Sequence, residues 1–149
     1  MREFTSWAMA SIAGSATAPT FNGLEEELAT LPGIYGPPSG CLLLALQDGK
    51  PAGCVAVKPH DSTTGELKRL YVRPGFRGRN IGGQLVAALI DEARAAGFGR
   101  VVLDSHISMT GAHAIYRAAG FRDVSAPEDF PESLKPVIVF MELTVDPAL

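Results

Sequence analysis

The feature that most constrains the fold of this chain is a basic, glycine-containing segment between an expected strand, residues 66–72, and an expected helix, residues 80–96. Gly97 follows the helix at the position where glycine often ends one. A short apolar run over residues 100–105 then indicates a second strand. The helix carries apolar residues at the spacing of one buried face, namely Ile81, Leu85, Ala88 and Leu89. This strand, helix and strand predict an α/β layout.

Other elements are expected on both sides of this unit. Apolar runs predict strands over residues 41–47, 52–58, 121–124 and 137–143. Asp48-Gly49, between the first two runs, is typical of a tight hairpin turn. Spacing and capping residues predict helices over residues 3–13, 23–31 and 109–119. We therefore expect one domain over residues 1–149, of the α/β (α+β) class, with mixed strand directions.

The composition indicates a folded chain without a membrane segment. Charged residues make up 19% of the 149 residues and hydrophobic residues 46%, which excludes intrinsic disorder. No apolar run approaches the roughly 20 residues that a membrane-spanning helix needs. Two cysteines, Cys41 and Cys54, do not make a disulfide framework, and we expect both to be small buried apolar residues. We expect a cytoplasmic protein.

The charges are distributed unevenly along the chain. The net charge is −3, but residues 67–90 contain five basic residues and no acidic one, so the remainder carries −8. The acidic balance argues against a general nucleic-acid binder. A basic segment that runs into a helix N-terminus is suited to anions, because free backbone N–H groups and the helix dipole point outward there. A solvated basic loop is the alternative explanation.

Three kinds of phosphate-binding loop compete for the glycines of this segment. A P-loop requires a Gly-Lys-Ser/Thr ending, which is absent. A dinucleotide fingerprint would use Gly78 and Gly83 with Asp104, 21 residues further on, as the ribose-binding acid. Against it, the preceding strand carries Lys68 and Arg69, whereas a central strand of that fold is apolar throughout. The third candidate is a cradle for the pyrophosphate of coenzyme A.

Two blocks of the sequence resemble the GNAT superfamily of N-acetyltransferases. In the first, Arg77, Asn80 and Gly82 occupy the three fixed places of the family pattern Arg/Gln-x-x-Gly-x-Gly/Ala. Asn80 replaces the usual glycine there, and asparagine both tolerates unusual backbone angles and caps helices. The second block, residues 112–121, resembles Ala-x-x-x-Tyr-x-x-x-Gly-Phe and contains Tyr116. The resemblance implies a mostly antiparallel central sheet flanked by helices.

The same resemblance implies direct transfer of an acetyl group from acetyl-CoA, as co-substrate, to the amine of a small molecule or peptide. Tyr116 matches the position of the acid that protonates the leaving thiolate. Glu66 matches a strand position that supplies the base in some members, with Asp104 and an ordered water as competitors. The backbone of the strand end would hold the pantetheine arm, and the loop after it would hold the pyrophosphate. The residues implied for this binding are Leu70, Tyr71, Val72, Arg77, Gly78, Arg79, Asn80, Ile81, Gly82 and Gly83.

The resemblance leaves several questions open. The family's first strand is expected to be missing, since the chain begins in the first helix, and an open sheet edge would favour a homodimer. No metal site is expected, because the three histidines, His60, His106 and His113, lack a ligand spacing. We expect His113 on the helix surface, and Tyr35 and Phe130 near the acceptor. A non-catalytic acyl-CoA-binding module of the same fold is the alternative function.

Overall fold

The computed structural model describes residues 33–146. The strands are β1 (Cys41–Gln47), β2 (Lys50–Pro59), β3 (Thr64–Val72), β4 (Arg100–His106), β5 (Arg122–Val124) and β6 (Ile138–Thr144). The α-helices are α3 (Ile81–Ala95) and α4 (Thr110–Ala118). These bounds agree closely with the sequence-based expectations for this part of the chain. The expected helices over residues 3–13 and 23–31, and the expected missing first strand, lie outside the described residues.

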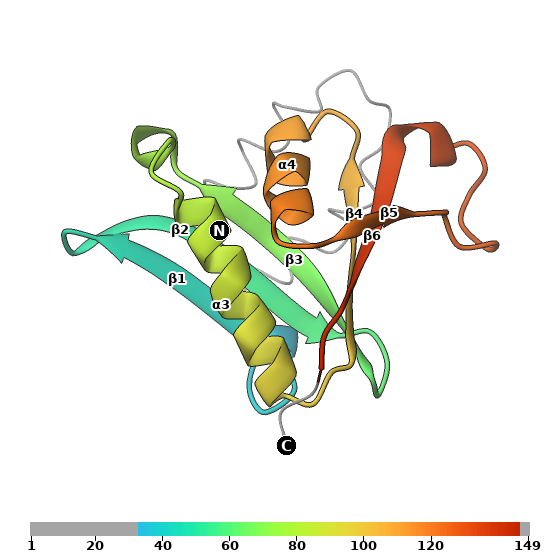
Figure 1. The fold of residues 1–149 in the computed structure, drawn as a ribbon, viewed down its shortest axis with the longest axis horizontal. Coiled ribbons are helices and arrows are strands. Elements are labelled where there is room, and N and C mark those ends of the chain that lie inside the picture. The colour runs from blue at the N-terminus through green and yellow to red at the C-terminus, as the bar shows by residue number, and fades with distance from the viewer. Residues whose placement is uncertain (1–32, 147–149) are drawn as a thin grey trace.

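The six strands form one mixed sheet in the order β1-β2-β3-β4-β6-β5 (Figure 1). Strands β3 and β4 pair in parallel through the α3 crossover, and the other four neighbouring pairs are antiparallel. The fold class expected from the sequence is therefore confirmed. The antiparallel neighbours of β3 and β4 also differ from the parallel sheet that a dinucleotide-binding fold requires.

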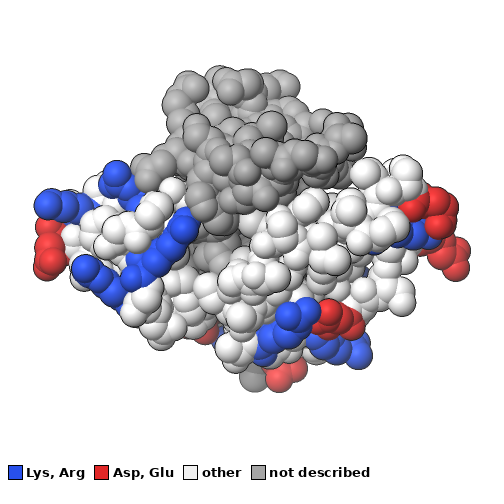
Figure 2. Space-filling model, turned by 90° about the horizontal axis from the view of Figure 1, so that it is seen from above, with Lys and Arg blue, Asp and Glu red and all other residues white. Residues whose placement is uncertain are grey.

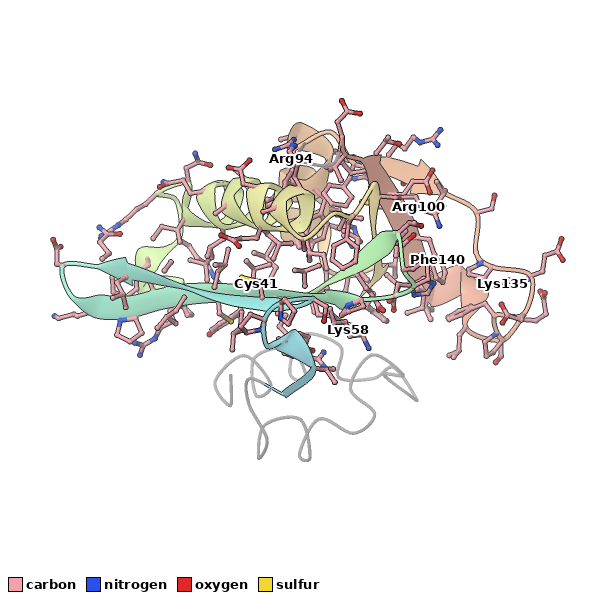
Figure 3. All side chains as sticks on the ribbon, turned by 90° about the horizontal axis from the view of Figure 1, so that it is seen from below. Cys41, Lys58, Arg94, Arg100, Lys135 and Phe140 are labelled. Carbon is pink, nitrogen blue, oxygen red and sulfur yellow. The ribbon has the colours of Figure 1, made fainter. Side chains whose placement is uncertain are left out.

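The two described α-helices cover the same face of the sheet (Figures 1 and 3). The apolar side of α3 packs on β1, β2 and β3, because Leu85, Val86 and Leu89 recur at helical spacing and are all buried. Leu67 and Val101 meet these side chains from β3 and β4. Gly97 follows α3 with a φ of 89°, as expected for a glycine that ends a helix.

Strand β3 contains a β-bulge that changes which face its side chains occupy. Cys54 of β2 lies opposite Tyr71 and Ala56 opposite Lys68, so β3 has two residues where β2 has one. One of the two is Arg69, whose φ is 61°. Before the bulge Leu67 faces the helices. After it Leu70, three positions later, packs against the same core.

Strands β3 and β4 pair only over a short stretch and then separate. Their register runs from Thr64 opposite Arg100 to Glu66 opposite Val102. Beyond these positions β3 continues to pair with β2 as far as Val72, and β4 continues to pair with β6 as far as His106. The sheet therefore opens between β3 and β4, as Figure 1 also shows.

Two expectations for single side chains have different outcomes. Both cysteines are free thiols; Cys54 is buried, as expected, whereas Cys41 is only half-buried. The surface position expected for His113 is wrong: only 3% of the residue is exposed, and its Nε2 lies 3.0 Å from the Ser105 hydroxyl. The α4 helix places the His113 ring against β4, where the ring forms a hydrogen bond with Ser105. No helix among residues 33–146 is long and apolar enough to cross a membrane.

Candidate functional site

A cavity of about 440 Å³ opens between the end of β3, the N-terminus of α3 and the start of α4. Nine of the ten residues expected to bind the co-substrate line it, namely Leu70, Tyr71, Val72, Arg77, Gly78, Asn80, Ile81, Gly82 and Gly83. Arg79 is the exception, because it lines a different groove between β1 and α3. Residues from one continuous strand, turn and helix therefore form most of one wall.

The α3 helix directs its first backbone N–H groups toward this cavity. Asn80 precedes the helix in the left-handed backbone region, with φ 58° and ψ 23°, and makes no side-chain capping hydrogen bond. The first bond of the helical ladder runs from the Gln84 N–H to the Asn80 carbonyl at 3.1 Å. The N–H groups of Ile81, Gly82 and Gly83 precede this bond. Of the two roles expected for Asn80, the structure shows the unusual backbone and not the side-chain cap.

Two glycines shape the loop: Gly78 leaves its backbone open, and Gly82 allows the start of α3 to pack closely on α4. Gly78 has a φ of 80° and a Cβ there would meet no atom within 4 Å, so its α-carbon faces open space. Gly82 lies against α4, where a Cβ would come within 2.7 Å of the Ile115 Cδ1. Glycines beside a helix N-terminus suit a pyrophosphate group, because backbone N–H groups without a neighbouring side chain can approach the phosphate oxygens directly.

Basic side chains gather near the same loop. Figure 2 shows Lys and Arg at the end of the molecule that carries the β3–α3 connection in Figure 1. The Arg77 Nε donates a hydrogen bond to the Val72 carbonyl at 2.9 Å, and its guanidinium lies 5.8 Å from the centre of the Tyr71 ring. Arg79 lies 5.7 Å from the centre of the Phe76 ring. Aromatic rings therefore support both guanidinium groups beside the loop.

Tyr116 lies on α4 beside this region, in the core rather than in the cavity wall. The residue is 5% exposed, and its ring centre lies 5.8 Å from that of Phe121. Burial raises the pKa of the Tyr116 hydroxyl, and the nearby Asp104 carboxylate raises it further. The phenol therefore keeps its proton over the physiological range, and the effect of Asp104 places the two groups near each other.

Glu66 lies at the last β3 position that pairs with β4, on the sheet face opposite α3. Lys58, its partner across β2, is on that face in Figure 3. Three basic side chains surround the Glu66 carboxylate: the Lys68 Nζ at 3.1 Å, the Lys58 Nζ at 3.9 Å and the His60 Nδ1 at 3.8 Å. The side chain is 15% exposed. The structure therefore places Glu66 in an ion-pair cluster.

Asp104 lies on β4 beyond the point where β3 and β4 separate. Its partner on β6 is Phe140, whose ring packs edge-on against Phe130 with centres 4.8 Å apart. Burial raises the pKa of the Asp104 carboxyl; the Lys68 ammonium lowers it by less, and the Glu66 charge adds to the increase. Asp104 thus lies within electrostatic reach of both Glu66 and Tyr116.

The cavity also contains residues that the sequence analysis did not assign to the site. They come from the β3–α3 turn, the β4–α4 connection and the first turns of α4, namely Phe76, Ser108, Met109, Thr110, Gly111, Ala112 and Ile115. The second family block already contained Ala112 and Ile115, which lie four positions and one position before Tyr116. Helical spacing from Tyr116 could therefore have identified Ala112, but not Ile115.

Tyr35 does not join this cavity. It is 1% exposed and lines a separate cavity of about 390 Å³, together with Cys41 and Glu92. Phe130, in contrast, packs edge-on against Phe140, the β6 partner of Asp104. Within residues 33–146 no three side chains of the kinds that bind metals form a group.

The sequence profile of the Acetyltransferase (GNAT) family matches residues 8–121. An uncharacterised N-acetyltransferase of Schizosaccharomyces pombe is 36% identical over 126 residues, which are 83% of this chain and 76% of that protein. An IAA acetyltransferase of Azospirillum brasilense is 37% identical over 67% of this chain and 65% of its own length. An N-acetylaspartate synthetase of Danio rerio is 33% identical over 72% of this chain, and the match covers 39% of that protein.

Solved structures with low sequence identity share the fold. An acetyltransferase from Streptococcus agalactiae superposes with a TM-score of 0.75 at 22% identity, over 97% of this chain and 90% of its own. PaiA N-acetyltransferase from Thermoplasma acidophilum, solved with coenzyme A, gives a TM-score of 0.73 at 20% identity, over 97% and 87% of the two chains. A GNAT family acetyltransferase from Elizabethkingia anophelis, solved with acetyl-CoA, gives 0.65 at 24% identity, over 83% and 82%.

Proposed function

This chain belongs to the acetyltransferase (GNAT) family, and we propose that it transfers the acetyl group of acetyl-CoA directly to a primary amine of a small molecule or peptide. The observation that carries the proposal is the cavity between the end of β3 and the N-terminus of α3. It combines an open strand end, a glycine-containing turn and free helix N–H groups. These are the features that an extended amide arm followed by a pyrophosphate requires.

The donor half of the site would bind acetyl-CoA mainly through the backbone. Leu70 and Val72 would pair with the pantetheine arm, with Tyr71 between them, at the strand end that has separated from β4. The N–H groups from Gly78 to Gly83 would hold the pyrophosphate, with Arg77 and Arg79 adding positive charge. Nine of these ten residues lie in the cavity wall, whereas Arg79 would have to reach it from the neighbouring groove.

The catalytic half of the site must remove a proton from an ammonium group and protonate a leaving thiolate. The thioester of acetyl-CoA supplies an activated acetyl carbonyl. Tyr116 would donate its hydroxyl proton to the sulfur, and burial keeps that proton in place at neutral pH. A carboxylate of the opposite sheet face, Glu66 or Asp104, would act as the base.

The acceptor and the assembly follow as further parts of the proposal. An acceptor amine would enter from the sheet face that carries Glu66, Asp104 and Phe140. A homodimer would cover strand β1, one of the two outer strands of the described sheet, where Leu44 and Leu46 are 61% and 60% exposed. We further propose that the whole chain acts as one domain in the cytoplasm.

Isothermal titration calorimetry and a thiol-release assay test the proposed function. We expect the purified chain to bind coenzyme A, and to release thiol from acetyl-CoA when spermidine, L-aspartate, glucosamine or an alanine-initiated peptide is added. Absence of coenzyme A binding would contradict the proposal. Tight binding without thiol release across a broader amine panel would instead support a non-catalytic acyl-CoA-binding module.

A further inference from the structure

The two carboxylates that could remove the proton differ in their immediate contacts. Glu66 lies among the Lys58, Lys68 and His60 side chains, with the Lys68 Nζ at 3.1 Å. Lys68 is 14% exposed and Glu66 15%, so this ion pair is largely withdrawn from solvent. The Glu66 carboxylate is therefore already in contact with neighbouring basic side chains, and an acceptor ammonium would have to compete with them for it.

Asp104 lies at the opening between the strands. Glu66 and Val102 form the last β3–β4 pair, and two positions further along the two strands come Lys68 and Asp104. Strand alternation keeps both on the face of Glu66 and Val102, so they lie on either side of the opening. Within the described part of the chain, Asp104 has no ion-pair partner within 4.0 Å.

We propose, building on the proposed acetyltransferase function, that Asp104 is the general base and that the Glu66–Lys68 ion pair is a positioning element beside it. Glu66 holds the Lys68 Nζ at 3.1 Å and so limits its pairing with Asp104. The Asp104 carboxylate thus remains available to an acceptor at the opening. Tyr116, within electrostatic reach of Asp104, would donate its proton to the leaving sulfur.

The reaction then balances as follows. Asp104 accepts one proton from the acceptor ammonium, and the freed amine nitrogen forms a bond to the acetyl carbon. The bond from that carbon to sulfur breaks, and Tyr116 gives its proton to the sulfur. The nitrogen loses a second proton, which restores the Tyr116 hydroxyl. The products are the amide, the thiol of coenzyme A and one proton, which Asp104 releases to solvent.

The charges around Asp104 determine how each substitution should act. Lys68, Glu66 and Arg69 face it from β3 and Tyr116 from α4, while its β6 partner Phe140 is not titratable. Glu66→Gln removes a like charge and releases Lys68, and both changes lower the pKa of Asp104. Lys68→Met removes an opposite charge and raises it.

The kinetic test compares Asp104→Asn, Glu66→Gln and Lys68→Met with the wild type, using the panel amine that turns over fastest. We expect Asp104→Asn to lose roughly 10²–10⁴-fold in kcat/KM while coenzyme A affinity stays unchanged in calorimetry. Glu66→Gln should lose much less kcat/KM and should shift the acid limb of the pH profile to lower pH. Lys68→Met should shift the acid limb to higher pH. The reverse ranking of Asp104→Asn and Glu66→Gln would overturn the proposal.

A carboxyl titration by ¹³C NMR tests the same arrangement without an acceptor. Asp104 should titrate above the ordinary value of about 3.9 in the wild type, lower in Glu66→Gln and higher in Lys68→Met. A titration at or below the ordinary value, or one that neither substitution moves, would overturn the role of Asp104. This result is independent of the amine panel, so it separates failure of this inference from failure of the proposed function.

Discussion

At the scale of single residues, burial raises the pKa of both groups that would transfer protons. Asp104 and Tyr116 both have raised pKa values because the charged form of each is poorly solvated, and each carboxylate or phenolate charge would disfavour the other. A raised pKa makes Asp104 a stronger base and makes Tyr116 a weaker acid. Tyr116 is thus better suited to donate a hydrogen bond to the sulfur than to release its proton early in the reaction.

Removal of the Tyr116 hydroxyl tests this role. We expect Tyr116→Phe to keep coenzyme A binding, because the ring packing on Phe121 is retained, and to lower kcat by roughly 10²–10⁴-fold. Tyr35→Phe is a matched control, since Tyr35 is an equally buried tyrosine in another cavity. Thiol-release kinetics with both variants make the comparison. A Tyr116→Phe enzyme with wild-type kcat would exclude a direct role for the hydroxyl.

At the scale of elements, the strand–turn–helix unit was the best predicted part of the chain. Strand β3 begins two residues earlier than expected, because Thr64 and Gly65 pair with Arg100 and Val101 of β4. Such pairing depends on a strand 36 residues further along the chain, which local sequence does not reveal. The bulge at Arg69 was not predicted either, since its φ of 61° follows from the register with β2.

The backbone at the start of α3 gives a prediction for Asn80. Since Asn80 has a φ of 58°, Asn80→Ala should lower the free energy of unfolding by about 1 kcal/mol, whereas Asn80→Gly should be nearly neutral. Urea denaturation measures both. Asn80→Gly should also retain coenzyme A affinity, because glycine adopts the same turn. Equal stability of the alanine variant and the wild type would contradict the strained backbone.

At the scale of the whole molecule, local ion pairs engage several of the acidic side chains that the structure describes. Within the described residues many acidic side chains are paired locally: Asp91 with Arg94, Asp123 with Arg117, Glu132 with Lys135, and Glu142 with Arg100 and Arg122. The attraction of a cationic acceptor by the overall negative charge, suggested by the sequence, is therefore weaker than the count implies.

Asp104 lowers the stability of the folded protein at neutral pH. Its folded-state pKa is raised above the unfolded value of about 3.9, so the folded state binds more protons between the two pKa values. Stability therefore falls as pH rises through this window and stays lowered above it. We expect Asp104→Asn to raise the Tm at pH 7 by roughly 2–4 °C and to change it little at pH 3.

Asp91→Asn is the matched control for this measurement, because Asp91 lies on the exposed surface of α3. Differential scanning calorimetry at both pH values compares the two variants. A Tm of Asp104→Asn that is unchanged or lower at pH 7 would contradict the raised pKa. Loss of activity together with a gain in stability is the combination expected of a buried functional carboxylate.

The sequence by itself determined the fold class, most element bounds and nine of the sixteen residues in the wall of the cavity, because these depend on periodicity, turn chemistry and contiguous motifs. Only the tertiary structure decided the surroundings of Glu66, the position of Asp104 at the β3–β4 opening and the burial of His113. The physical reason is that charge pairing and desolvation depend on which strands and helices meet, and such contacts join residues far apart in the chain.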